Sequence, residues 1–316
     1  MQSYDVIIIG AGPAGLTSAL YSARSKLDTL YIESLGIGGQ VATTEEVENY
    51  PGFSQGINGF ELSTQMEEQA QRFGAKNLIA KVHSLETMDK YHIVNTTKGT
   101  FASKTIIIAT GATPRYLNCP GENTFRSRGV SYCATCDGAF FEGANIVVVG
   151  GGNAAVEEAC YLTRFADKVT IIHRRNALRA TKLIQERALS NPKIELIWNT
   201  VIEEILGEET VKKVILKNLE TEQKIELPID GVFIYVGNEP NTHFVRNLIE
   251  LTEEGYIKTD DFMRTNIPGV YAVGDVRQKL LRQVVTAVSD GAIAAYHAEK
   301  YIEEYFPESM ENNLRR

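Results

Sequence analysis

Two cysteines separated by two residues, Cys133 and Cys136, are the side chains of this sequence best suited to redox chemistry, and Asp137 follows them directly. A thiol pair at this spacing can close as a disulfide and reopen as a dithiol. Cysteine reactivity depends on thiolate character, and Cys-X-X-Cys motifs often lower the pKa of one thiol. The motif therefore predicts a disulfide that opens and closes during function.

A zinc site is the first alternative for this cysteine pair, but structural zinc usually takes four ligands from two paired motifs. Cys119 and Cys160 stand alone in the sequence, and no two histidines have the His-x₃₋₅-His spacing. A permanently closed structural disulfide is the second alternative, and four cysteines in 316 residues do not make a disulfide scaffold. We therefore expect redox chemistry and no metal.

The beginning of the chain has the pattern of a dinucleotide-binding turn. The apolar run 6–9 predicts a buried parallel strand, and it leads into a G-x-G-x-x-G motif at 10–15, a helical pattern and a second strand at 29–32. The first glycine of such a motif makes the tight turn, the second lets the backbone approach a pyrophosphate, and the third lets the helix pack on the strand. Glu33, about 20 residues further on, stands where a carboxylate binds a ribose hydroxyl.

A second pattern of this kind lies just after the cysteines. The run 145–149 predicts a strand that opens into glycines at 150–152, and Ala155 stands at the third motif position, which G-x-G-x-x-G/A permits. The next apolar run, 169–172, ends in basic residues instead of an acid, namely His173, Arg174 and Arg175, with Arg179 further on. Arginines at this place suit a 2′-phosphate and favour NADP over NAD. A solvated basic face is the alternative interpretation of these arginines.

Composition excludes several classes of function. Lys plus Arg is 32 and Asp plus Glu is 40, giving a formal net charge of −8, so a broad basic face for nucleic acid is not expected. No apolar run approaches the ~18 residues of a membrane-spanning helix. The first residues carry no basic segment of the kind that opens a signal peptide. We expect no membrane association and a cytoplasmic location.

Between these motifs the chain alternates strands and helices, which indicates an α/β fold. A strand that ends in Gly274-Asp275 can place a carboxylate against the ribityl or phosphate end of a flavin. The other expected features are a helix at 60–73, strands between 78 and 110 ending at Gly111, a connector at 112–117, strands between 194 and 235, a return linker at 238–241 and a helix at 282–302.

The motifs occur in one order along the whole chain: Gly10–Gly15, Gly38-Gly39-Gln40, Glu48–Gly52, Ala109–Ala112, Cys133–Gly138, Gly150–Asn153, His173–Arg175 and Gly274–Val276. In this order they resemble the low-molecular-weight, bacterial-type thioredoxin reductases, a branch of the flavoprotein pyridine nucleotide-disulfide oxidoreductases. The larger glutathione-reductase type is longer and carries its cysteines near the first glycine turn, where this chain has none.

This resemblance implies two Rossmann-like, three-layer domains, with an NADPH domain inserted into an FAD domain. The expected boundaries are 1–115 for the first FAD segment, 116–240 for the NADPH domain with the dithiol, and 241–316 for the second FAD segment. Electrons would pass from NADPH to FAD, then to the Cys133–Cys136 disulfide, then to thioredoxin. The resemblance also implies that Cys136 faces the flavin, that Cys133 attacks thioredoxin, that Asp137 is the acid–base group and that the protein is a homodimer.

The resemblance assigns cofactor-binding residues motif by motif. The FAD set is Gly10, Gly12, Pro13, Ala14, Gly15, Glu33, Ser34, Gly38, Gly39, Gln40, Val41, Asn49, Gly111, Gly274, Asp275, Arg282, Gln283 and Val284. The NADPH set is Gly150, Gly152, Asn153, Ala154, Ala155, His173, Arg174, Arg175 and Arg179.

Two other functions fit the same motifs. One is a related FAD-dependent oxidase that passes electrons from small-molecule dithiols to oxygen. The other is a non-enzymatic redox sensor whose dithiol switches a partner interface. Rapid flavin reduction by NADPH argues against a bare sensor, and peroxide release with dithiols and no thioredoxin favours the oxidase.

Overall fold

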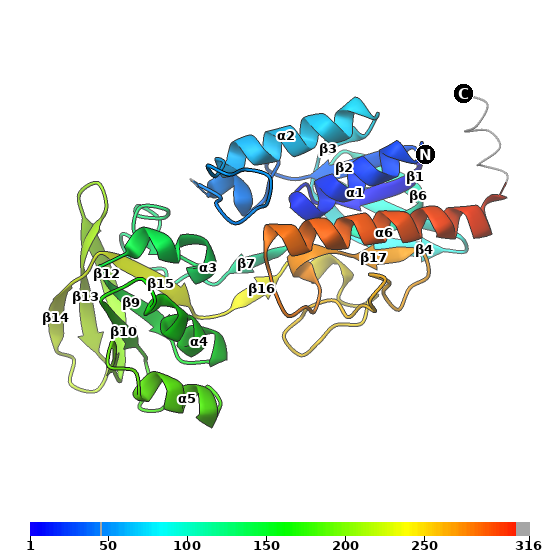
Figure 1. Ribbon diagram of the computed structural model, residues 1–316. Coiled ribbons are helices and arrows are strands. Elements are labelled where there is room, and N and C mark those ends of the chain that lie inside the picture. The colour runs from blue at the N-terminus through cyan, green and yellow to red at the C-terminus, as the bar shows by residue number, and fades with distance from the viewer. Residues whose placement is uncertain (45, 308–316) are drawn as a thin grey trace. The chain divides into compact units, whose positions relative to one another are not determined.

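The computed structural model describes residues 1–44 and 46–307, and it divides the chain into two compact units (Figure 1). Unit 1 consists of residues 1–113 and 239–316, and unit 2 consists of residues 114–238. Both units combine a parallel sheet with helices, which confirms the predicted α/β class.

Unit 1 is built on a seven-stranded sheet in the order β3-β2-β1-β6-β5-β4, with β17 also paired to β6. The pairs along β3-β2-β1-β6 and the β6–β17 pair are parallel, whereas β5 is antiparallel to both β4 and β6. The strands are β1 (Gln2–Ile9), β2 (Thr29–Glu33), β3 (Lys76–Ile79), β4 (Val82–Met88), β5 (Tyr91–Thr96), β6 (Gly99–Ile108) and β17 (Val270–Ala272).

Alternation along the central strands buries both faces of this sheet. Ile8 and Ile107 face a core cluster with α1 and α6. Ile7 and Ile106 face a second cluster, which includes residues of the return segment, the part of unit 1 that begins at residue 239. Helix α1 packs closely on α6, and the Ser18 hydroxyl donates to the Gly291 carbonyl at 3.2 Å. The helical elements of unit 1 are α1 (Pro13–Arg24), α2 (Gly59–Arg72), α6 (Val284–Tyr305), and the short 3-10 turns η1 (Val41–Thr43), η3 (His243–Val245) and η4 (Gly274–Val276).

Unit 2 has three layers. Its five-stranded sheet has the order β11-β10-β9-β15-β8, and every pair in it is parallel. Ile146 and Val148 of β9 pack with the helix side, while Val147 and Val149 pack with an antiparallel sheet on the other face. Successive side chains of β9 point to opposite faces of the sheet, so this one strand packs against both outer layers.

The elements of unit 2 occur as follows along the chain. They are β8 (Val130–Ser131), α3 (Ala134–Asp137), η2 (Gly138–Phe141), β9 (Asn145–Gly150), α4 (Asn153–Leu162), β10 (Lys168–Ile172), α5 (Lys182–Leu189), β11 (Ile194–Ile197), β12 (Thr200–Gly207), β13 (Val211–Asn218), β14 (Lys224–Pro228) and β15 (Gly231–Tyr235). Strands β12, β13 and β14 form the antiparallel layer.

The chain crosses between the units twice, and the two crossings pair with each other. Strands β7 (Ala112–Pro114) and β16 (Asn238–Pro240) form a two-stranded ribbon. Beside it the Thr110 hydroxyl donates to the Asn241 carbonyl at 2.8 Å, and the Asn241 amide donates back to the Thr110 carbonyl at 2.8 Å. Among the residues described, no helix has the length and apolar character needed to cross a membrane.

The close packing of α1 on α6 predicts an unusual effect of a glycine-to-alanine change. Alanine normally stabilises a helix relative to glycine by about 1 kcal/mol. At Gly291, however, a Cβ would lie 2.4 Å from the Ala14 carbonyl oxygen. Gly291→Ala should therefore lower the free energy of unfolding by about 1–3 kcal/mol, as overpacking does.

Thermal unfolding checks this prediction, with Ser289→Ala as the control on an exposed position of the same helix. The control should melt within a degree or two of wild type, since exposed substitutions change stability by less than about 0.5 kcal/mol. A Gly291→Ala protein that melts above the control would show that α1 and α6 are not in such close contact.

Candidate active site and nucleotide-binding turns

Cys133 and Cys136 form a disulfide with an S–S distance of 2.21 Å. Cys133 is the N-cap residue of α3, and the Cys136 and Asp137 amides both donate to the Cys133 carbonyl. The short span between the two cysteines lets the pair close as a disulfide and reopen, which is the requirement of thiol–disulfide chemistry. The other cysteines are not disulfide-bonded, and burial raises the pKa of the Cys119 thiol to about 11 and also raises that of Cys160.

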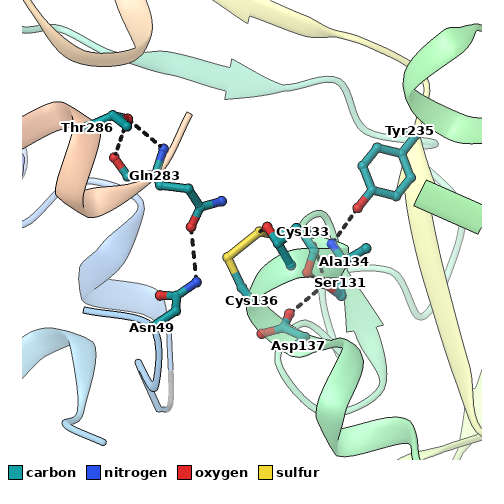
Figure 2. Close-up of a disulfide and its surroundings, with 10 residues drawn as sticks. Asn49, Ser131, Cys133, Ala134, Cys136, Asp137, Tyr235, Gln283 and Thr286 are labelled. Atoms are coloured by element: carbon teal, nitrogen blue, oxygen red, sulfur yellow. Dashed lines mark hydrogen bonds between the residues drawn. A yellow bond between two sulfur atoms is a disulfide. The ribbon is translucent and has the colours of Figure 1, made fainter. Parts of the chain in front are cut away.

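Ser131 and Tyr235 hold α3 from two neighbouring strands of unit 2 (Figure 2). The Ser131 hydroxyl donates to Asp137 Oδ2 at 2.5 Å, and the Cys133 amide donates to the Ser131 oxygen at 3.1 Å. The Ala134 amide donates to the Tyr235 hydroxyl. The backbone of the cysteine motif and the carboxylate behind it are therefore fixed by the same serine.

The environment of Asp137 suits a carboxyl group that exchanges protons. Burial raises the pKa of Asp137 above its ordinary value, and the hydrogen bond from Ser131 acts in the opposite direction. Burial also raises the pKa of Tyr235, with smaller contributions from the charges of Glu158 and Asp137. The Tyr235 hydroxyl therefore stays protonated, and Asp137 is the buried carboxyl group beside the cysteines whose affinity for a proton is increased.

The first glycine turn leaves the beginning of α1 open at the edge of the unit 1 sheet. Gly10 has φ +108°, and a Cβ there would lie 2.4 Å from the Ala109 carbonyl oxygen. At Gly15 a Cβ would lie 2.0 Å from the Gly10 oxygen, so helix and strand are in direct contact. The N-cap is Gly12, Pro13 follows at N1, and no described side chain caps the helix. Amide groups without a cap are suited to a phosphate.

Glu33 connects this turn to the end of β2. Its Oε2 accepts the Ala11 amide at 2.9 Å, while Oε1 accepts the Ser34 and Leu35 amides at 2.6 and 3.1 Å. A carboxylate has about four acceptor positions, so Oε2 can still accept a hydroxyl group. Glu33 therefore fixes the turn and keeps capacity for a ribose.

Two further segments come next to the first turn. The Gly38 amide donates to the Ala11 carbonyl at 2.7 Å, and a Cβ at Gly39 would lie 3.6 Å from the Gly12 Cα. The Gln40 amide group donates to the Ala112 carbonyl at 3.1 Å, next to Gly111. These contacts gather the 38–40 and 111 motifs around the turn.

The third segment links Asn49 to the beginning of α6. The Asn49 side chain donates to Gln283 Oε1 at 3.1 Å (Figure 2). Gln283 also forms a capping box with Thr286, which fixes the first turn of α6. Val41 and Val284 pack against the same small apolar cluster.

Gly274 brings the return segment against the first turn. It has φ +72°, and a Cβ there would lie 3.0 Å from the Ala14 Cβ. Burial raises the pKa of the adjacent Asp275, while the charges of Lys279 and Arg282 lower it. The Arg282 guanidinium lies 4.2 Å from the centre of the Tyr256 ring, and its buried Nε has no hydrogen-bond partner among the residues described. A donor of this kind suits an anionic or carbonyl group of a ligand.

The second glycine turn repeats the first in unit 2. Gly150 has φ +153°, and a Cβ there would lie 2.5 Å from the Tyr235 carbonyl oxygen and 2.6 Å from the Ala155 Cβ. Gly152 is the N-cap of α4, and within the described chain no side chain caps that helix either. A Cβ at Gly152 would meet no described heavy atom within 4 Å. Asn153 instead accepts the Thr181 amide at 2.8 Å, and Ala154 is exposed.

The basic residues after β10 divide into a buried and an exposed group. His173 is 5% exposed and lies under Gly151, where a Cβ would come within 2.2 Å of the imidazole ring. Burial lowers its pKa, and the charges of Arg179 and Arg175 lower it further. Arg174, Arg175 and Arg179 are exposed, and no described carboxylate lies within ion-pair distance of them. The Arg179 amide donates to the Gly151 carbonyl at 2.6 Å, which brings this segment back to the glycine turn.

The structure thus gathers the residues expected to bind FAD in unit 1, and the dithiol with the residues expected to bind NADPH in unit 2. It also adds residues that the sequence motifs do not identify. Tyr235 and Ser131 support the cysteines, and Asp290 accepts the Gly274 amide at 3.0 Å. Only the position of Tyr235 at the end of an apolar run, where parallel strands carry functional groups, could have indicated its role.

Known proteins resemble this chain over most of its length. The family model for pyridine nucleotide-disulphide oxidoreductases matches residues 4–291. The chain is 50% identical over 311 residues to a thioredoxin reductase of Peptoclostridium litorale, covering 96% of this chain and 99% of the relative. It is 49% identical to the thioredoxin reductase of Bacillus subtilis, covering 95% of each chain. A crystal structure of thioredoxin reductase from Streptococcus pyogenes MGAS5005 matches with a TM-score of 0.93 at 50% identity, covering 96% of this chain and 99% of that one.

The contact between Ser131 and Asp137 predicts a change in proton affinity. Ser131→Ala removes a hydrogen bond to the ionised carboxylate, so the pKa of Asp137 should rise further above its ordinary value. A raised folded-state pKa means that the protonated carboxyl contributes stability below the unfolded pKa, and that this contribution is lost as the pH rises through the folded pKa. In the variant, the protonated carboxyl should therefore contribute stability up to a higher pH than in wild type.

A carboxyl-carbon NMR titration of the oxidised protein measures this pKa, with Asp137→Asn identifying the signal. Ser190→Ala makes the same change at an exposed position of unit 2 and should leave the titration unaltered. An unchanged or lower pKa in Ser131→Ala would contradict the hydrogen bond.

Proposed function

The chain belongs to the pyridine nucleotide-disulphide oxidoreductase family, among its thioredoxin reductases, and from this membership we propose that it reduces the disulfide of thioredoxin with electrons from NADPH. The electrons pass through FAD and the Cys133–Cys136 pair. The observation that carries the proposal is the disulfide at the N-terminus of α3, with a buried carboxyl group directly behind it.

We assign FAD to unit 1, which corresponds within two residues to the domain expected from the sequence at 1–115 and 241–316. The support is the open N-terminus of α1, the remaining capacity of Glu33, and the buried Arg282 Nε without a described partner. The Gly38–Val41 segment, Asn49, Gly111, Gln283 and Val284 complete the set that would hold it. When bound, a flavin supplies two-electron chemistry between a nicotinamide and a disulfide.

NADPH is assigned to unit 2, residues 114–238, which corresponds to the inserted domain expected from the sequence at 116–240. The N-terminus of α4 would hold the pyrophosphate, since a Cβ at Gly152 meets nothing there. The exposed guanidinium groups of Arg174, Arg175 and Arg179 would bind the 2′-phosphate. His173 would support the glycine turn by packing against it, because its ring fills the space that a side chain at Gly151 would need.

The thiols of the chain perform the final exchange. In the assignment that the resemblance implies, the Cys133 thiolate attacks one sulfur of the thioredoxin disulfide, forms a mixed disulfide and releases the other thioredoxin sulfur as a thiolate. Cys136 then attacks the Cys133 sulfur, so the Cys133–Cys136 disulfide forms and the second thioredoxin sulfur leaves. Two electrons and two protons reach thioredoxin, and Asp137, with its raised pKa, holds a proton for a departing thiolate.

Thioredoxin is the proposed protein substrate, and the name of the relatives at about half identity is its support. A homodimer is proposed from the family resemblance. The cytoplasm is the proposed location, because a dithiol that must reopen in every cycle suits a reducing compartment.

Single cysteine variants test the route of the electrons. Cys133→Ser and Cys136→Ser should each lose thioredoxin reduction to the level of no enzyme, because one thiol cannot form the Cys133–Cys136 disulfide. Both should keep NADPH oxidation with ferricyanide, a one-electron acceptor that needs no dithiol. The measurement is NADPH consumption with a panel of thioredoxins and insulin, with Cys160→Ser as the control.

If the wild-type protein reduces no thioredoxin and releases peroxide with small dithiols, the result would favour the oxidase instead. A folded wild-type protein that takes up no FAD and oxidises no NADPH would leave only the redox sensor.

The arginines after β10 predict the choice of nicotinamide. Each charge-assisted hydrogen bond contributes ~1.5–3 kcal/mol, so two partly exposed contacts give roughly 3–4 kcal/mol, or a preference for NADPH of about 10²–10³. Arg174→Ala/Arg175→Ala should raise the KM for NADPH and leave that for NADH nearly unchanged. The kcat at saturating NADPH should fall less than kcat/KM, because these groups bind ground and transition states alike.

Steady-state kinetics with both nucleotides decide this, with Arg187→Ala as an exposed control in the same unit. Equal use of NADH and NADPH by wild type, or an equal loss with both in the double variant, would mean that these arginines form a solvated face.

A further inference from the structure

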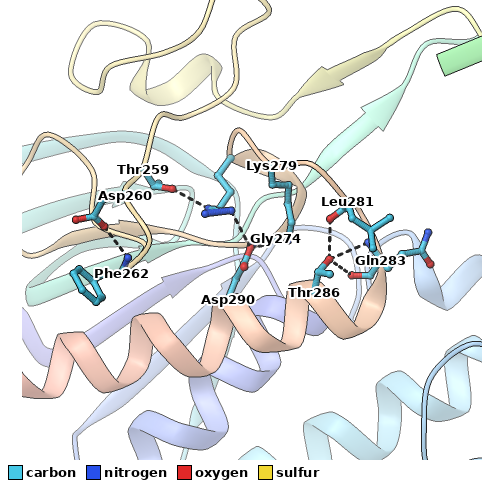
Figure 3. A network of polar contacts seen from close by, with 10 residues as sticks. Thr259, Asp260, Phe262, Gly274, Lys279, Leu281, Gln283, Thr286 and Asp290 are labelled. Carbon is cyan, nitrogen blue, oxygen red and sulfur yellow. Dashed lines mark hydrogen bonds and ion pairs between the residues drawn. The ribbon is translucent and has the colours of Figure 1, made fainter. Parts of the chain in front are cut away.

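A buried ion-pair cluster lies directly behind the Gly274 turn of unit 1 (Figure 3). Asp290 of α6 carries it: its Oδ2 accepts the Lys279 ammonium at 2.7 Å and the Gly274 amide at 3.0 Å, and Arg277 Nη1 lies 3.8 Å away. The side chains of Lys279 and Asp290 are only 6% and 9% exposed. No sequence motif discussed above includes Lys279 or Asp290.

A contribution to the free energy of folding does not by itself explain why an ion pair is buried here. Removing two charges from water costs more than their attraction commonly returns, and well-packed apolar side chains often replace a buried pair without loss. A buried pair is better explained when one of its atoms has a geometric task. Here the shared atom is Asp290 Oδ2, and its third partner is a backbone amide of the turn.

That amide belongs to a turn held tightly from two sides. Gly274 has φ +72°, which few residues other than glycine adopt, and a Cβ there would already lie 3.0 Å from the Ala14 Cβ. On the other side the Asp290 carboxylate fixes the Gly274 amide. Asp275 follows immediately, so the direction of its side chain depends on how this amide is held.

Lys279 and Arg277 place two positive side chains beside the buried Asp290 carboxylate. Lys279 contacts the carboxylate directly, and Arg277 is itself held by the hydrogen bond from its Nε to the Thr259 hydroxyl at 2.8 Å. Lys279 also acts on Asp275, whose raised pKa it lowers. The same cation therefore supports both carboxylates, one behind the turn and one on it.

We propose that Asp290 is a positioning residue of the flavin site: paired with Lys279, it holds the Gly274 amide so that the turn presents Asp275 to the flavin. This inference rests on the proposed assignment of FAD to unit 1. Asp290 touches no ligand itself and acts through the turn. Its hydrogen-bond acceptor is the necessary feature, and its charge requires Lys279 as a partner.

Two double variants separate the acceptor from the charge. Lys279→Met/Asp290→Asn removes both charges but keeps a side-chain oxygen that can accept the Gly274 amide. Lys279→Met/Asp290→Leu removes the charges and the acceptor together. The Asn variant should bind FAD with nearly the wild-type dissociation constant. The Leu variant should bind FAD with a dissociation constant about tenfold higher or more.

Dissociation is followed by the return of flavin fluorescence on dilution of the FAD-loaded full chain, beside the melting temperature of each protein. Lys300→Met/Glu303→Asn changes an exposed pair of the same helix and should alter neither quantity. If the Leu variant does not fold, Lys279→Met/Asp290→Ala, which also lacks the acceptor, replaces it.

Equal FAD affinity of the Asn and acceptor-free variants would overturn the inference, and so would failure of both acceptor-free variants to fold, which would make Asp290 a requirement of the fold. Wild type that binds no FAD would refute the assignment of the cofactor instead, so the two failures are distinguishable.

Discussion

The N-terminus of a helix can meet a phosphate only where no side chain of the preceding turn stands in front of it, and this constraint organises both units. The strand must reverse into the helix within a few residues, which brings backbone against backbone. At Gly10 a Cβ would lie 2.4 Å from the Ala109 oxygen, and at Gly150 it would lie 2.5 Å from the Tyr235 oxygen. In each case the blocking oxygen lies at the end of a neighbouring strand, because Ala109 directly follows β6 and Tyr235 is the last residue of β15. The turns therefore require a parallel sheet around them, and the hydrophobic alternation of β1 and β9 supplies it.

The two turns satisfy this constraint with opposite charges at the end of the next strand. In unit 1 the Glu33 carboxylate accepts the Ala11 amide at 2.9 Å, so an acid fixes the turn through its backbone. In unit 2 the imidazole of His173 fills the space under Gly151, and burial keeps its pKa low. The lowered pKa of His173 means that its ring adds no positive charge beside the exposed arginines, and no described carboxylate lies within ion-pair distance of them. The same fold element can therefore favour a ribose hydroxyl in one unit and a phosphate in the other.

Local patterns were sufficient to predict the α/β class, both glycine turns and the cysteine pair, because each depends on residues close in sequence. The predicted helices at 60–73 and 282–302 correspond to α2 (Gly59–Arg72) and α6 (Val284–Tyr305), with small differences at their ends. The supports of the site could not be predicted in this way. Tyr235 reaches Ala134 across 101 positions, and Asn241 reaches Thr110 across 131. In the sequence Asp290 is an ordinary polar residue of a predicted helix, and only the fold shows that it accepts the Gly274 amide.

The insertion of unit 2 also determines the order in which the chain can fold. Ser18 of α1 bonds to Gly291 of α6 across 273 positions, and β17 joins the sheet beside β6 only after the return crossing. During synthesis the apolar face of α1 therefore cannot be buried against α6 until nearly the whole chain has been made. Unit 2 is continuous from 114 to 238, so its core can close first. Because β7 pairs with β16, a folded unit 2 leaves its two ends together, as a short loop would. The late arrival of α6 then closes an entropically small loop instead of a long one.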